Sequence, residues 1–247
     1  MNMRRPIDFS AFRGQGAAVE NLAVFMEAAR SRNEPLEHVL LHGPPGLGKT
    51  SIAEIIGAGA TGVLRRVAAP AVESVRDMVG LLSSIDAGDV LFIDEIHRLP
   101  VAVEEQLYTA MEDFRFDLLF GEGTEARSVS IDLPRFTLIG ATTRVGLVAK
   151  PLLDRFGIVT RLDYYDVESL SAIIADALSS LGVSADRQAI ALLAQGSRGT
   201  PRIALRLCRR VADFFPDRLD EQGARHVVDR LGLGANGIDE MDRRYLS

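Results

Sequence analysis

The stretch GPPGLGKTS, residues 43–51, decides how the rest of the chain is interpreted. It lies between a short apolar run, HVLL, and an alternating segment, SIAEIIG, and it satisfies G-x-x-x-x-G-K-[ST] through Gly43, Gly48, Lys49 and Thr50. A glycine-rich turn between a strand and a helix lets backbone N–H groups surround phosphate oxygens, and the positive end of the helix attracts the same anion. The stretch therefore predicts a phosphate-binding loop. It leaves open whether the phosphate serves group transfer, a binding switch or mechanical work.

Each residue type in this loop has a chemical task. Lys49 is expected to reach the β- and γ-phosphates of a nucleotide, and Thr50 to ligate Mg²⁺. The residues expected to contact the nucleotide here are Gly43, Pro44, Gly46, Leu47, Gly48, Lys49, Thr50 and Ser51. ATP and Mg²⁺ are therefore the expected cofactors.

The first part of the chain alternates short apolar runs with helix-like stretches. The runs HVLLH, DVLFID and FTLIGAT, at 38–42, 89–94 and 136–142, are too short for helices and nearly continuous in apolar character, as strands buried on both faces are. Helical spacing is seen at 17–31, 49–58, 73–85 and 101–113. Strands that alternate with helices predict a doubly wound α/β domain with a parallel sheet.

The pattern changes after about residue 162, where only helix-like segments and no strand run are evident. These segments are 168–181, 187–196, 201–215 and 221–232. We therefore expect a P-loop α/β domain over 1–161 followed by a small all-helical lid domain over 162–231. The glycine-rich stretch GLGANGI predicts a linker within 232–247.

Charge and cysteine content limit the classes of protein. The net charge is −6 and the pI about 5.3, so no overall basic field draws the chain onto nucleic acid, although a local basic stripe stays possible. The single cysteine, Cys208, excludes an internal disulfide and a cysteine-based zinc site. Since no apolar run approaches the ~20 residues that span a bilayer and no secretory signal opens the chain, we expect a cytoplasmic protein without membrane contact.

One inserted segment, FDLLFGEGTEARSVSIDL at 116–133, has two strand-like arms around GEGTEA and predicts a β-hairpin. Its second arm alternates polar residues with Val129 and Ile131. Two interpretations stay open: a half-buried hairpin that packs on its own domain, or a protruding hairpin whose Val129 and Ile131 bind a partner.

The segment LFIDEIHRL carries the acidic residues that nucleotide hydrolysis requires. Asp94 and Glu95 end an apolar strand, so both are expected at the carboxyl edge of the sheet, where ligands bind in such folds. Asp94 can hold Mg²⁺, and Glu95 can orient or deprotonate an attacking water. A single Asp suits a kinase or a GTPase switch, whereas the Asp–Glu pair favours hydrolysis of ATP by water.

Three further residues are candidates for contact with the phosphates. Thr143 follows the strand FTLIGAT and can sense the γ-phosphate or hold the water. Arg155, in PLLDRFG, can reach out of its own subunit. Arg202 lies in the first turn of a helix that opens with Pro201, where a cation is unfavourable unless an anion such as a nucleotide phosphate holds it.

Taken together, these motifs resemble those of an AAA+ ATPase. Their exact sequences are similar to those of the RuvB family, the bacterial Holliday-junction branch-migration motor. The stretches that carry the resemblance span almost all of residues 5–215: RPIDFSAFRGQ, HVLLHGPPGLGKT, DVLFIDEIHRL, VEEQLYTAMEDF, GEGTEARSVSIDLPRFTLIGATTR, DRFGIV and SRGTPRIALRLCRRV. The resemblance implies these roles: phosphate-loop lysine and magnesium ligand for Lys49 and Thr50, second acidic motif for Asp94 and Glu95, γ-phosphate sensor for Thr143, arginine finger for Arg155, and lid arginine for Arg202.

The resemblance also implies where the base binds and with what the chain assembles. Arg5 and Pro6, in the segment 5–15, together with Tyr165, lie where the family holds adenine, and Pro201 accompanies Arg202 beside the nucleotide. The family forms hexameric rings around duplex DNA, so a homo-oligomeric ring is expected. The hairpin with Val129 and Ile131 coincides with the family's contact element for the junction-binding partner, RuvA.

The sequence departs from the family pattern in three places. Leu153 stands where an arginine is usual, Arg13 replaces an apolar residue, and the chain stops where the family continues into a winged-helix DNA-binding domain. We therefore expect weak binding to duplex or Holliday-junction DNA. The main hypothesis is an ATP-hydrolysing ring motor for branch migration in DNA recombination and repair. The alternative is a shortened, nucleotide-dependent binding or assembly module that does not translocate DNA. A third interpretation, a P-loop kinase, lacks support because nothing in the sequence indicates a pocket for a phosphate acceptor.

Overall fold

Five parallel strands form the sheet of the first domain, in the order β2-β3-β6-β1-β7. The computed structural model describes residues 8–120 and 127–230. The strands are β1 (Val39–His42), β2 (Leu64–Ala68), β3 (Val90–Asp94), β6 (Thr137–Thr142) and β7 (Ile158–Arg161). The predicted parallel α/β fold is confirmed, including the three apolar runs expected as strands. β2 and β7 were not predicted, because both are edge strands without a continuous apolar run: β2 has only exposed and half-buried residues, and β7 alternates buried with exposed residues.

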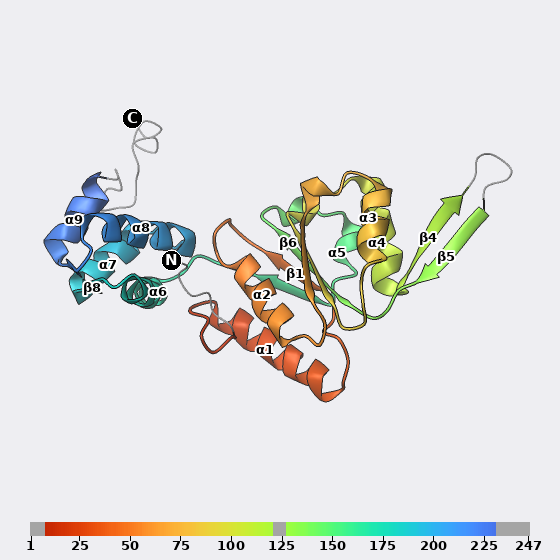
Figure 1. The fold of residues 1–247 in the computed structure, drawn as a ribbon, viewed down its shortest axis with the longest axis horizontal. Helices are drawn as coiled ribbons and strands as arrows, with labels where there is room; N and C mark the ends of the chain where they lie inside the picture. The colour runs from red at the N-terminus through yellow and green to blue at the C-terminus, as the bar shows by residue number, and fades with distance from the viewer. Residues whose placement is uncertain (1–7, 121–126, 231–247) are drawn as a thin grey trace.

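Helices cover both faces of this sheet. The longer helices are α1 (Gly16–Ser31), α2 (Lys49–Gly59), α3 (Val75–Leu82) and α4 (Val101–Glu112), and α5 (Lys150–Leu153) is a single turn. α3 and α4 lie on the opposite side of the sheet from α1 and α2 (Figure 1). Each of the four predicted helices in this domain is present within a few residues of its expected limits.

The core alternates across the sheet as a two-residue period requires. In β1, Val39 and Leu41 join the core on the side of α1 and α2, whereas Leu40 joins the core under α3 and α4. All three side chains are fully buried. Strands buried on both faces hold the sheet rigid, and a rigid sheet fixes the positions of the residues that follow each strand.

The lid consists of four helices, as predicted: α6 (Val167–Ser180), α7 (Arg187–Gly196), α8 (Pro201–Phe214) and α9 (Glu221–Arg230). The expectation of no strand was wrong in one detail, because Ser184–Ala185 (β8) pairs in parallel with Arg218–Leu219 (β9). Such two-residue strands leave no periodic signal in a sequence. The lid core is continuous with the core around α1 and α2, so the two domains share one apolar cluster.

The inserted segment forms an antiparallel hairpin of β4 (Arg115–Phe120) and β5 (Arg127–Asp132), whose strands pair with each other. It projects from the α/β domain at the end of the molecule opposite the lid (Figure 1). The base is anchored by Phe116, which is fully buried, whereas Val129 and Ile131 further along β5 are 46% and 37% exposed. This geometry agrees with a protruding hairpin rather than one that lies flat on its own domain.

Two predicted structural elements lie wholly or partly outside the residues that the structure describes. The expected linker at 232–247 lies outside the described residues, and so does the tip of the hairpin at 121–126. In the described part, no helix combines the length and the apolar character that a bilayer span needs.

Candidate nucleotide-binding site

The strand register brings three predicted segments to one edge of the sheet. β6 lies between β1 and β3, with His42 opposite Thr142 on one side and Ile93 opposite Gly140 on the other. The phosphate loop follows His42, Asp94 and Glu95 end or follow β3, and Thr143 follows β6. The carboxyl ends of parallel strands meet at a common edge, so the loop, the acidic pair and the threonine converge there, as the sequence predicted.

The phosphate loop ends in a helix whose N-terminus faces this edge. α2 begins at Lys49 and Thr50, and its N-cap, Gly48, supplies no side chain to its free N–H groups. Lys49 is buried, and its Nζ donates hydrogen bonds to the carbonyl oxygens of Gly43 and Pro44, at 2.7 and 2.9 Å. The ammonium is therefore held inside the curve of the loop.

Electrostatics link Lys49 to the other candidate residues. Burial lowers the pKa of the Lys49 ammonium, the negative charges of Glu95 and Asp94 act to raise it, and the Arg202 guanidinium acts to lower it, with a lowered pKa as the net result. Two carboxylates and two cations thus lie within electrostatic reach of one another around the loop.

Glu95 occupies a special backbone position. Its φ of 53° lies in the left-handed region, which an L-residue seldom adopts and which the structure must hold in place. The Asp94 carboxylate accepts the Glu95 N–H at 3.0 Å, and the Thr143 hydroxyl donates to Glu95 Oε2 at 3.1 Å. The turn at Glu95 therefore directs its carboxylate toward the loop that follows β6.

The lid reaches the phosphate loop directly. The N–H of Arg202, the second residue of α8, donates to the Gly46 carbonyl at 3.3 Å. A Cβ at Gly46 would come within 2.9 Å of side-chain atoms of both Thr200 and Arg202, and the φ of +82° there disfavours any other residue. Pro201 is buried beside this contact, and the Arg202 side chain is exposed. Arg202 thus lies at the loop, as predicted.

The segment before α1 closes the other side of the loop. The Phe12 ring lies against Gly48, and the Tyr165 hydroxyl donates to the Leu47 carbonyl at 3.0 Å. Burial raises the pKa of Tyr165 to about 12, so this hydroxyl keeps its proton. The side-chain amide of Gln15 bonds to both the N–H and the carbonyl of Asp163, in the segment between the domains. Phe12 and Tyr165 therefore lie against the loop on the side where the family resemblance places adenine.

Of the two departures from the family pattern that lie in the described residues, one has a partner in the lid. Arg13 forms an exposed ion pair with Asp176 of α6, with Nε and Oδ2 3.4 Å apart. Leu153 is half-buried and packs on the core under α3 and α4. Arg5 and Pro6, which were expected near adenine, lie outside the described residues.

Arg155 is held away from the loop of its own chain. It donates to the carbonyls of Tyr108 and Pro151 at 3.2 and 2.7 Å and pairs with Glu112 at 2.8 Å. Its guanidinium also lies over the Tyr108 ring, 4.9 Å from the centroid. These contacts fix it on α4 and α5, beside a hollow of about 370 Å³ lined by Met111, Glu112, Asp154 and Arg155.

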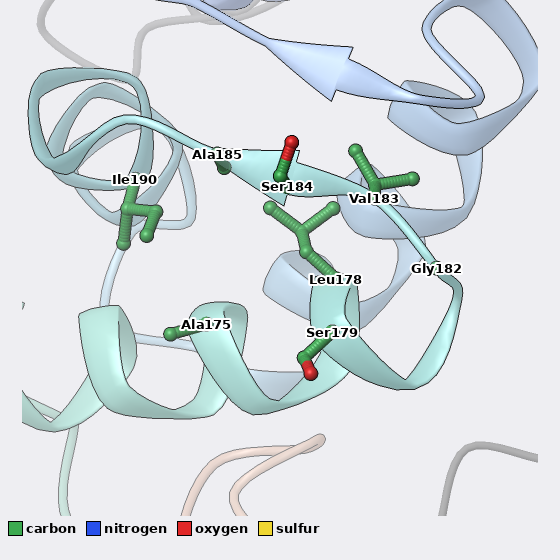
Figure 2. A pocket seen from close by; sticks show the side chains of 8 residues that line it. All are labelled: Ala175, Leu178, Ser179, Gly182, Val183, Ser184, Ala185 and Ile190. Atoms are coloured by element: carbon green, nitrogen blue, oxygen red, sulfur yellow. The ribbon is translucent and has the colours of Figure 1, made fainter.

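A second hollow lies in the lid and carries no titratable side chain. It has a volume of about 350 Å³ and is formed by α6, β8 and the start of α7 (Figure 2). Its lining residues are Ala175, Leu178, Ser179, Gly182, Val183, Ser184, Ala185 and Ile190. No charged or metal-ligating group lines it, so it offers no chemistry for nucleotide hydrolysis.

The residues at the edge of the sheet fit a magnesium nucleotide. Gly43 and Gly46 keep the loop backbone bare of side chains, the start of α2 offers uncapped N–H groups, and Lys49 supplies a cation. Thr50 and Asp94 have the oxygen donors that Mg²⁺ prefers. Sequence analysis included Phe12 and Gln15 only as part of the segment 5–15, without a role for either residue. It assigned no role to His97, which contacts Glu95; the position of His97 within DEIH was the one signal that could have drawn attention to it.

A parallel sheet, a phosphate loop, an acidic pair after β3 and a helical lid in contact with the loop together define a P-loop ATPase of the AAA+ class. Comparison with known proteins makes the assignment specific. Residues 4–162 match the family described as the Holliday junction DNA helicase RuvB P-loop domain, and residues 165–233 match the RuvB AAA lid domain.

Relatives cover nearly the whole chain. The Holliday junction branch migration complex subunit RuvB of Myxococcus xanthus is 52% identical over 98% of this chain and 72% of its own length, and that of Gluconobacter oxydans is 51% identical over 98% and 70%. The solved structure of the Thermotoga maritima RuvB Holliday junction branch migration motor has a TM-score of 0.89 and 43% identity, covering 98% of this chain and 78% of that one. The chain belongs to the RuvB family, which confirms the resemblance inferred from its motifs.

The position of Glu95 leads to a test of its role. Glu95→Gln keeps the size of the side chain but removes its basicity, so we expect nucleotide binding to persist while ATP hydrolysis falls by ~10²–10⁴-fold, the usual cost of losing a general base. Affinity for a fluorescent ADP analogue and release of phosphate from ATP should be measured on the same preparation. Hydrolysis near the unsubstituted rate would remove Glu95 from the mechanism.

Proposed function

We propose that the chain hydrolyses ATP within a ring of identical copies and that the ring drives branch migration of Holliday junctions in DNA recombination and repair. The observation that carries the proposal is the convergence of Lys49, Glu95 and Thr143 at one sheet edge, in direct contact with the lid. The names of the RuvB relatives supply the substrate, because they describe subunits of a Holliday junction branch migration complex.

In this proposal each residue has a separate task. The N-terminus of α2 and Lys49 hold the phosphates, while Thr50 and Asp94 hold Mg²⁺, which offsets the charge of the phosphate oxygens when bound. Glu95 orients the attacking water and takes its proton, and Thr143 contacts the γ-phosphate. Arg202 contacts the phosphates and begins α8. Its backbone N–H is bonded to the Gly46 carbonyl, so loss of the γ-phosphate changes the contact between the loop and α8. Phe12 and Tyr165 enclose the base.

The place of Arg155 supports action between subunits. The described residues bond it to α4 and α5 and not to the phosphate loop of the same chain. An arginine in that position can stabilise charge on the γ-phosphate of a neighbouring copy, which requires an assembly. The family forms hexamers, so a six-membered ring is the proposed state.

The shape of the hairpin supports the proposal that a partner protein binds at the end of the molecule opposite the lid. Val129 and Ile131 share one face of β5, because side chains two residues apart in a strand point the same way. Both are exposed. Their hairpin lies at the end of the molecule opposite the lid (Figure 1). An apolar face on a projecting hairpin fits docking to the junction-binding protein RuvA.

Mixing two inactive variants tests the trans role of Arg155. Arg155→Ala lacks the finger and Lys49→Ala lacks the phosphate-loop cation, so each alone should lose most hydrolysis, ~10³–10⁵-fold for the finger. In mixed assemblies, a Lys49→Ala subunit can supply Arg155 to a neighbour with an intact loop. Phosphate release should therefore recover in mixtures. If mixed assemblies form, as shown by mass measurement, and hydrolysis does not recover, Arg155 does not act in trans.

The partner role of the hairpin can be separated from its fold. Val129→Glu together with Ile131→Glu should weaken binding to purified RuvA by at least tenfold, because a charge pressed into an apolar contact loses its water without gaining a partner. Basal ATP hydrolysis and the melting temperature should stay near those of the unsubstituted chain. Ser130→Glu, on the opposite face of β5, is the matched control. Equal binding by the double variant would exclude this face, and unfolding would show that both side chains belong to the core.

A further inference from the structure

His97 contacts the carboxylate of Glu95, although no role above involves it. It lies in the 3₁₀ turn Ile96–Arg98 that follows β3, and its side chain is only 8% exposed. Its Nδ1 is 3.2 Å from Glu95 Oε2 and 2.8 Å from the hydroxyl oxygen of Thr142, the last residue of β6. One ring nitrogen therefore faces both the acidic residue and the neighbouring strand.

The contacts of Glu95 are unequal at its two oxygens. Oε2 lies 3.2 Å from His97 Nδ1, 3.1 Å from the Thr143 hydroxyl and 3.4 Å from the Thr143 N–H. Oε1 lies 3.4 Å from the same hydroxyl. The donors thus converge on Oε2, which leaves Oε1 with acceptor capacity for a water proton.

The proton on His97 decides whether the contact is attractive. A carboxylate only accepts hydrogen bonds, so Nδ1 must carry a hydrogen to bind Oε2. The Thr142 oxygen already accepts the Arg144 N–H at 2.9 Å, and its own hydroxyl has one hydrogen to give. If Nδ1 were bare, its single lone pair would accept that hydrogen, and the ring would have nothing to donate to Oε2. Glu95 is therefore held in place only when Nδ1 carries a hydrogen.

We propose that His97 is a positioning residue for hydrolysis: its Nδ1–H binds Oε2 of Glu95 and so makes Oε1 the oxygen that receives the proton of the attacking water. This inference rests on the proposed role of Glu95. The Thr143 hydroxyl has a single hydrogen, so when it serves the γ-phosphate it no longer donates to Glu95. His97 is then the side chain that keeps the carboxylate oriented.

Kinetics of His97 variants test the proposal. His97→Ala should lower kcat for ATP by about 10- to 100-fold, the scale of a misplaced catalytic group, while KM and the affinity for a fluorescent ADP analogue change less than about twofold. His97→Asn should restore most of kcat, because its amide places an N–H near the position of Nδ1. Arg98→Ala, an exposed neighbour in the same turn, is the matched control.

Each outcome bears on a different claim. Unchanged kcat in His97→Ala, or equal losses in the Ala and Asn variants with an intact fold, would overturn the positioning role while Glu95 keeps its own. If the unsubstituted chain does not hydrolyse ATP, and Lys49→Ala changes nothing, the proposed function itself fails.

The tautomer can be measured without turnover. Two-bond proton–nitrogen spectra of the ¹⁵N-labelled histidine rings distinguish a protonated Nδ1 from a bare one, with His97→Asn to assign the signal. We expect the Nδ1–H form in the unsubstituted chain. A ring protonated only at Nε2 would contradict the inference whatever the kinetics, and it would do so even if His97→Ala were too unstable to assay.

Discussion

Two glycines of the phosphate loop, Gly43 and Gly46, let other segments come directly against its backbone, and the contact of the loop with the rest of the chain depends on that close approach. At Gly43 a Cβ would strike the carbonyl oxygen of Leu162, in the segment that joins the domains, and at Gly46 it would press on Thr200 and Arg202 of the lid. The same bare backbone that suits phosphate oxygens also admits the joining segment and the lid. The loop is therefore both a ligand cradle and the joint between the two domains.

Because the loop both binds the ligand and joins the domains, the elements around it must hold it in place on both sides. The strands β1, β3 and β6 are buried on both faces and hold the loop, the acidic pair and Thr143 in fixed register. The lid shares an apolar core with the same face of the sheet, so it has a stable resting position against the loop. A change of charge in the cradle acts on Lys49, whose pKa already responds to Glu95, Asp94 and Arg202.

Much of the fold and of the candidate site could be predicted from the sequence, because apolar runs, glycine-rich turns and helical periodicity are visible in short stretches of the chain. The apolar runs of β1, β3 and β6, the glycine-rich loop and the helical period of the lid predicted the α/β domain, the edge at which Glu95 and Thr143 meet, and the four lid helices. Their positions in the sequence suggested roles for Arg155 and Arg202, and the family resemblance made these roles specific. Like the roles of the other site residues they stay predictions, although the position of each is compatible with its role.

The features that could not be predicted depend on contacts between distant segments. β2 and β7 are edge strands whose pairing, rather than their composition, makes them strands. The family resemblance placed the segment 5–15 near the base, but the individual contacts of Phe12 with Gly48 and of Gln15 with Asp163 arise only because this segment folds across the loop and the joining segment. His97 follows the acidic pair by two residues, but its contact with Thr142 arises from the pairing of β3 with β6.

The most direct test asks whether the loop is the joint that couples nucleotide to the lid. Spin labels at Ala102→Cys of α4 and Gln222→Cys of α9, both exposed positions, report the distance between the domains, and Cys208 is buried with a pKa raised to about 12 and does not compete for label. We predict that a non-hydrolysable ATP analogue shifts the distance distribution, and that Gly46→Val shifts it without nucleotide because its side chain displaces Thr200 and Arg202. Identical distributions for the unsubstituted chain with and without nucleotide, and for Gly46→Val, would contradict the account.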